Sequence, residues 1–130
     1  MLRTLIVACF ALFLASGNTT PMEQAIQAVH PTFQPGPYAH DSILARSSAQ
    51  SFTKKEREAI DQIGKKSGCH TCGSKKPGTL TGHFIPDHQP PTALNEPKKS
   101  QRLYPHCLKC SREQGLAIAR FLKEKEKEKK

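Results

Sequence analysis

Two Cys-x-x-Cys pairs constrain the fold of this chain more than any other feature of its sequence. The first pair is Cys69 and Cys72, the second is Cys107 and Cys110, and 34 residues separate the pairs. Each pair can turn two thiolates toward one point, and two pairs complete a tetrahedral Cys₄ zinc site. An ion bound there would close a long loop and fold the chain around itself. The spacing therefore predicts a small domain held together by a structural zinc.

The start of the chain has the pattern of a secretory signal peptide. An apolar run over residues 5–15 leads into Ala15-Ser16-Gly17, small residues of the kind a signal peptidase reads. We predict a signal peptide over residues 1–17, cleaved after Gly17, and hence a secreted protein. An uncleaved anchor is the alternative, although about a dozen apolar residues fall short of the roughly 20 that span a bilayer.

Secretion opens a second interpretation of the four paired cysteines. An oxidising compartment favours disulfides, and four cysteines allow three pairings. Disulfide scaffolds seldom need two Cys-x-x-Cys units that face each other, so the spacing favours metal. Zinc and disulfides predict different behaviour, since a chelator removes the first and a reductant the second.

The rest of the chain divides by composition. Residues 18–52 are rich in Pro and Ser and predict a linker or pro-segment, in which a capping box at Thr20 can start a short helix to about Val29. The pattern indicates a folded domain over residues 53–122. Residues 123–130 alternate Lys and Glu, which places like charges at i,i+4 and predicts a charged tail that frays.

Three regular elements are expected inside the domain. A capping box at Thr53 predicts a helix that stops at Gly64, and Ser111 opens a helix with apolar Leu116, Ile118, Phe121 and Leu122. Between the cysteine pairs, residues 79–85 predict a strand that leads into Pro86-Asp87-His88. About 70 residues with so few aromatic side chains make a thin core, which is why a staple is needed.

Charge points toward an anionic partner. The formal net charge is +9, and residues 54–122 hold 13 Lys or Arg against 6 Asp or Glu. Such an excess suits nucleic acid or another polyanion, and plain solubility is the other explanation.

Asp87-His88 is the pair with the clearest chemistry. Histidine titrates near neutrality and can take a proton from water. A neighbouring carboxylate can hold a divalent cation that stabilises charge on a phosphate. The position of this dipeptide between two cysteine pairs that are predicted to bind a metal strengthens the prediction of a catalytic role.

These residues resemble the cysteine-framed branch of the HNH/endonuclease VII (His-metal-finger) nucleases, and they are similar to nuclease domains of polymorphic toxins. The pattern here reads CHTC, then GHFIPDHQPP, then QRLYPHCLKCSREQG, and covers about residues 69–115. The resemblance implies a small α+β fold with a zinc-stapled ββα-metal core and flanking helices. Zinc would be structural, and the activity would be metal-dependent hydrolysis of phosphodiester bonds in DNA or RNA.

The resemblance also implies roles for particular residues. His88 would be the general base, and Asp87 a ligand of a catalytic Mg²⁺ or other divalent ion. Basic residues would follow the nucleic-acid backbone: Lys75, Lys76, Lys98, Lys99 and Arg102.

The chain departs from that family at two positions. Gln101-Arg102 stands where the family carries its middle asparagine, and Asn95 lies in a different stretch. The closing helix offers Ser111, Glu113 and Gln114 in place of the last family ligand. Of these, Gln114 lies one turn beyond Cys110 and is the candidate second ligand.

Other histidines compete for roles. His83 can join the site or simply sit on the strand, and His70 and His106 can replace a thiolate as zinc ligands. Because four cysteines already satisfy zinc, we expect surface positions for His70 and His106. Two other classes of function remain open: a non-catalytic zinc module that binds nucleic acid or another polyanion, and a disulfide-bonded extracellular interaction protein.

Overall fold

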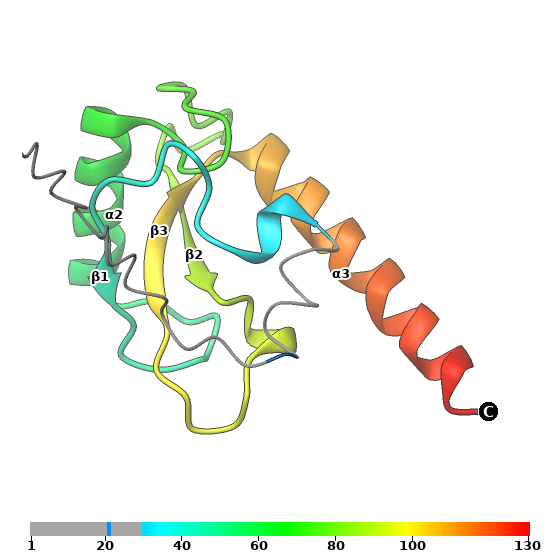
Figure 1. Ribbon diagram of the computed structural model, residues 1–130. Coiled ribbons are helices and arrows are strands. Elements are labelled where there is room, and N and C mark those ends of the chain that lie inside the picture. Colours follow the sequence, from blue (N-terminus) through cyan, green and yellow to red (C-terminus); the bar gives the residue numbers. More distant parts are fainter. Residues whose placement is uncertain (1–20, 22–29) are drawn as a thin grey trace, which may run out of the picture.

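The computed structural model of the chain describes Pro21 and residues 30–130 (Figure 1). The predicted signal peptide over residues 1–17 and, Pro21 apart, the predicted helix to Val29 lie outside the described residues. The described part is a small α+β structure with a three-stranded antiparallel sheet and two helices. Within it, neither helix is long and apolar enough to cross a membrane.

The sheet has the strand order β1–β3–β2, and both outer strands run antiparallel to β3. In Figure 1 the sheet lies between the two helices, with α2 and α3 on opposite sides. The elements follow the chain in this order: η1 (Pro31–Phe33), β1 (Ile43–Leu44), α2 (Lys54–Ser67), β2 (Ile85–Gln89), η2 (Thr92–Leu94), β3 (Arg102–His106) and α3 (Leu108–Glu128).

The hydrophobic core is small and includes the cysteines. Ile60 of α2 and Leu103 of β3 are completely buried, and Phe84 packs with them. Three of the four paired cysteines belong to the same buried cluster. The core and the cysteine site are therefore one unit, as a staple for a thin core requires.

Helix α2 begins where the sequence predicts and ends later. The Glu56 backbone N–H donates to Thr53 Oγ1 over 3.1 Å, and the Thr53 N–H donates to the Glu56 carboxylate over 2.8 Å, which confirms the capping box. That Thr53 N–H also holds the pKa of Glu56 below its ordinary value. The predicted stop at Gly64 is wrong, because the helix continues to Ser67. Gly68, at φ 84°, is the residue that ends it.

Gly64 has a packing role in place of a stop. A Cβ built there would clash with the buried Phe84 ring, whereas a Cβ at Gly115 on α3 would meet nothing within 4 Å. We expect Gly64→Ala to lower the free energy of unfolding, because overpacking a core costs about 1–3 kcal/mol. Gly115→Ala should be neutral or stabilise by up to about 1 kcal/mol through helix propensity. Urea unfolding of both variants checks this, and equal effects would contradict it.

The predicted strand over residues 79–85 is also displaced, since β2 spans Ile85–Gln89. Side chains bend the preceding backbone locally: Thr79 Oγ1 donates to the His83 carbonyl over 2.7 Å, and Gly82 has a φ of 72°. The carboxylate of Asp61 on α2 then accepts the Phe84 N–H over 3.1 Å. Antiparallel pairing with β3 begins at the next residue, Ile85.

Part of the predicted linker belongs to the fold. Thr32 and Phe33 of η1 are buried, and β1 pairs with β3. The backbone of this segment bonds to distant partners, as when the Tyr38 N–H donates to the His70 carbonyl over 3.0 Å. The folded region therefore begins before residue 53, because a Pro-rich segment can be ordered by tertiary hydrogen bonds without regular structure of its own.

The predicted fraying of the charged tail is wrong. Helix α3 starts at Leu108, with Cys107 as its N-cap, and runs to Glu128. Lys125 and Glu128 form an i,i+3 ion pair at 2.9 Å. Lys and Glu are strong helix formers, so the tail continues the helix into solvent.

Candidate functional site

The four paired cysteines converge, as the spacing predicts. Their sulfur atoms all lie within 4.8 Å of one another, and Cys72 Sγ is 3.8 Å from Cys107 Sγ. A zinc tetrahedron with Zn–S bonds of about 2.3 Å has S–S edges of about 3.8 Å. The cluster can hold a metal ion such as zinc.

Backbone hydrogen bonds bring the two cysteine turns together. The Gly73 N–H donates to the Cys69 carbonyl over 2.8 Å and closes the first turn. The His70 N–H donates to the Pro105 carbonyl over 2.9 Å, which ties that turn to the end of β3. The second turn opens α3, where the Cys110 N–H donates to Cys107 Sγ over 3.4 Å. A helix N-terminus favours a thiolate, and so a metal ligand.

The buried thiols of the cluster need a nearby cation in order to ionise. Burial raises the pKa of Cys69 and of Cys110, so these thiols resist ionisation without a cation. A bound divalent ion reverses this preference, because a coordinating thiol is deprotonated. All four cysteines are free thiols, and a 3.8 Å sulfur separation is far longer than a disulfide bond of about 2.05 Å.

Asp87 and His88 point to opposite faces of β2. Asp87 pairs with Tyr104 and His88 pairs with Leu103 across the β2–β3 ladder. Successive side chains on a strand alternate, so His88 shares the α2 side with the core residue Leu103. Asp87 faces the other side, toward α3.

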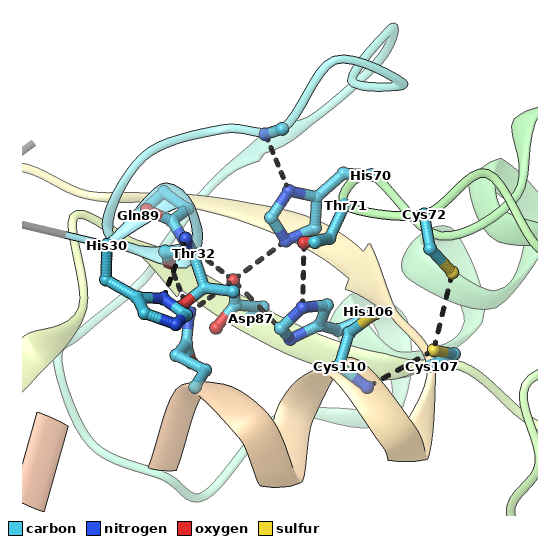
Figure 2. A network of polar contacts seen from close by, with 12 residues as sticks. His30, Thr32, His70, Thr71, Cys72, Asp87, Gln89, His106, Cys107 and Cys110 are labelled. Carbon is cyan, nitrogen blue, oxygen red and sulfur yellow. Dashed lines mark hydrogen bonds and ion pairs between the residues drawn. The ribbon is translucent and has the colours of Figure 1, made fainter. Parts of the chain in front are cut away.

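The Asp87 carboxylate is the centre of a buried polar network (Figure 2). Its Oδ2 lies 2.9 Å from His70 Nε2 and accepts hydrogen bonds from the amides of Gln89, at 2.7 Å, and Gln114, at 3.3 Å. Both amides also donate to the Thr32 carbonyl, over 3.0 and 2.8 Å. An amide turned the other way would place two oxygens together, so Thr32 fixes both glutamines as donors to Asp87.

Two histidines that we expected on the surface border this carboxylate. His70 and His106 are both completely buried, so the predicted surface positions are wrong. Their rings lie 4.6 Å apart, and neither is at the cysteine cluster as a substitute zinc ligand. His70, Asp87 and His106 form a second group whose ligand atoms lie within 4.8 Å of one another. Burial lowers the pKa of His106 to about 4.

His88 is held in one tautomer. Its Nε2 donates to the Ser47 carbonyl over 2.7 Å, and its ring packs 5.3 Å from the ring of Phe52. Because Nε2 carries the proton in that bond, the neutral ring has its lone pair on Nδ1. This Nδ1 is buried and has no hydrogen-bond partner in the described chain.

A cavity of about 180 Å³ adjoins the network. Asp87 and His88 border it from β2, Ser111 and Gln114 from α3, and the loop around η2 completes the wall. Gln101 braces that loop, since its amide donates to the Pro90 carbonyl over 2.7 Å. Gln114, the predicted second metal ligand, contacts Asp87 itself, because its amide nitrogen donates a hydrogen bond to the Asp87 carboxylate.

The predicted nucleic-acid-binding residues do not form one patch. Lys75 and Lys76 are exposed beside the first cysteine turn, at the Ile85 end of the β2–β3 hairpin. Lys98 and Lys99 are exposed in the connection at its other end. Arg102 is bonded to Ser42, with Nε 2.6 Å from the Ser42 hydroxyl. His83 and Asn95 also lie away from Asp87: His83 pairs with Asp61 at 2.8 Å, and the Asn95 amide donates to the Lys99 carbonyl.

Sequence reasoning missed most of the network around Asp87. One signal was available, because His70 and His106 each adjoin a cysteine of a pair, which ties both to the same place in the fold. No comparable signal marks Thr32, which reaches Gln114 across 82 positions.

Comparison with known proteins adds no relative. The chain matches no protein-family model, and searches of curated proteins and of solved structures return no match.

Proposed function

We propose that the chain is a small secreted metal-dependent nuclease, with a structural zinc at the Cys₄ cluster and its reactive groups on β2, where His88 would be the base and Asp87 would hold a second divalent ion. The order β2, β3, α3 supports this: an antiparallel hairpin carries Asp-His, and the second cysteine pair opens the helix. That order agrees with the ββα-metal core of the nucleases that the motif resembles.

The observation that carries the proposal is the state of His88. A buried polar atom without a partner is uncommon in proteins, and catalytic groups are among its explanations. The Ser47 carbonyl holds His88 in the tautomer whose Nδ1 can accept a proton. A base fixed in this way suits the removal of a proton from the water that attacks a phosphodiester.

Asp87 would bind the divalent cation of the reaction. Three donors converge on its Oδ2 and fix the carboxylate, which leaves Oδ1 for another partner. A divalent cation bound by Asp87 would stabilise the negative charge that develops on the phosphate. The residues present fit a cation, since a preoriented carboxylate at a polar cavity is a suitable ligand.

Cleavage of plasmid DNA and of RNA by the purified, zinc-loaded protein tests the proposal. Wild type should cut in the presence of Mg²⁺, Mn²⁺ or Zn²⁺. His88→Gln should cut about 10²–10⁴-fold more slowly, because its amide can still donate to Ser47 but cannot serve as a base. His83→Gln is the matched control, since His83 is exposed, pairs with Asp61 and should not affect the rate.

The proposal fails if wild type cuts neither substrate with any of these ions, or if His88→Gln cuts as fast as wild type. Salt-sensitive binding of nucleic acid without cleavage would then support the alternative, a non-catalytic module that binds polyanions through its exposed lysines.

A further inference from the structure

We propose that Asp87 and His106 together bind a second divalent transition-metal ion, separate from the ion at the Cys₄ cluster. The inference rests on the proposed function in one respect, because it assigns the missing protein ligand of the same Asp87 ion.

The two side chains lie on the same face of the sheet. Asp87 pairs with Tyr104, and His106 follows two positions later on β3, so both project toward α3. His106 Nδ1 lies 3.8 Å from Asp87 Oδ2. This is too long for a hydrogen bond. Two ligand atoms on one zinc-like ion, each bonded at about 2.1 Å, lie about 3–4 Å apart, so the carboxylate and this nitrogen are close enough to share an ion. Because three donors already reach Oδ2, the ion would bond to the other carboxylate oxygen, Oδ1.

His106 has a nitrogen that needs a partner. Its Nδ1 is buried and has no hydrogen bond to any described residue. On the other side of the ring, Nε2 lies 3.0 Å from the Thr71 hydroxyl. When Nε2 donates to Thr71, Nδ1 carries the lone pair that a metal requires. Metal-binding histidines usually make such a hydrogen bond with their second nitrogen.

His70 is a positioning residue in this site rather than a ligand. The Gly36 N–H donates to His70 Nδ1 over 3.0 Å, so the only lone pair of the neutral ring is already used. Its Nε2–H therefore donates to Asp87 Oδ2 over 2.9 Å. His70 orients the carboxylate toward the ion, together with the amides of Gln89 and Gln114.

The ligand types select the class of ion. Mg²⁺ prefers oxygen ligands, whereas an imidazole nitrogen favours Zn²⁺, Co²⁺ or Ni²⁺. Two protein ligands leave coordination positions open, which an ion that contacts a phosphate oxygen needs. The structure thus favours a transition metal over Mg²⁺ at Asp87.

Cobalt binding to the whole protein tests the site without nucleic acid. Protein refolded with excess Co²⁺ and freed of unbound metal is measured for cobalt content. Its absorption is also recorded, because thiolate-to-cobalt charge transfer reports the Cys₄ cluster alone. Wild type should hold two ions per chain. Asp87→Asn and His106→Ala should each hold one, with the charge-transfer band intact, and His83→Ala should hold two.

His70→Gln separates positioning from ligation. Competition with a chelator should show about 10–100-fold weaker binding of the second ion, with the stoichiometry still at two when cobalt is in excess. Loss of the second ion at saturating cobalt would make His70 a ligand and correct this part of the proposal.

One ion per chain in wild type, or two in a folded His106→Ala, would overturn the site. If His106→Ala loses the charge-transfer band and does not fold, the near-isosteric Asp87→Asn decides the question. Two ions without cleavage would refute the nuclease and leave the site intact. Cleavage by wild type that holds one ion per chain would refute the second metal site and leave the nuclease proposal standing.

Discussion

Removal of zinc by a strong chelator is expected to unfold the protein, with loss of most of its far-ultraviolet circular dichroism. Zinc binding contributes about 10–16 kcal/mol in small zinc-stabilised domains, whereas whole domains are stable by about 5–15 kcal/mol. In this protein the cysteines are also part of the core, beside Ile60, Phe84 and Leu103. Losing the ion therefore disrupts the packing between the sheet and the start of α3.

Two comparisons make this result specific. A reductant alone should leave the structure unchanged, because no disulfide joins any of the four paired cysteines. Cys72→Ser should mimic chelation even though Cys72 is exposed, since the substitution removes a ligand and little buried surface. Unfolding by reductant but not by chelator would refute the zinc site and support disulfides.

Phe33→Ala is expected to lower the free energy of unfolding by about 3–5 kcal/mol, the usual cost of removing a buried aromatic ring. Phe33 lies in the stretch that the composition indicates as a linker, yet it is only 1% exposed. Its ring packs against Phe121 of α3 with centroids 5.8 Å apart. The residue before it, Thr32, is bonded to both glutamines of the Asp87 network, so the loss should loosen that network too.

Leu44→Ala is the control for this substitution. Leu44 comes from the same compositional stretch but is 63% exposed, so its change should stay within about 0.5 kcal/mol. Guanidinium unfolding of the zinc-loaded proteins measures both. Equal stability of Phe33→Ala and wild type would mean that residues 30–44 are a linker after all.

Local patterns in the sequence predicted the parts of the structure that depend on short spacings. The capping box at Thr53 involves residues three positions apart, and its hydrogen bonds form as predicted. The two Cys-x-x-Cys turns are similarly local, and once both exist, one ion can specify how they meet. The wrong stop at Gly64 shows the limit, because the residue that decides its role, Phe84, is distant in sequence.

The surroundings of Asp87 could not be derived in the same way. Which neighbours reach a side chain depends on strand register, and a shift of one residue would exchange the faces of Asp87 and His88. The observed register sends Asp87 toward His70, His106 and Gln114, and sends His88 toward Phe52 and Ser47. Charge and motif suggested a single Asp-His site, and the register separates its two members.

The sequence by itself determined the convergence of the two cysteine pairs, the class of small α+β fold and the place of Asp87-His88 between those pairs. It did not place Asp87-His88 on a strand, because it predicted the strand at residues 79–85 and β2 spans Ile85–Gln89. Tertiary structure alone decided that His70 and His106 are buried beside Asp87 and that η1 closes the network through the Thr32 carbonyl. The physical reason is the range of the interactions. Turns and caps are settled by neighbouring residues, whereas a buried polar group takes its partners from whatever the packed chain brings within hydrogen-bond distance.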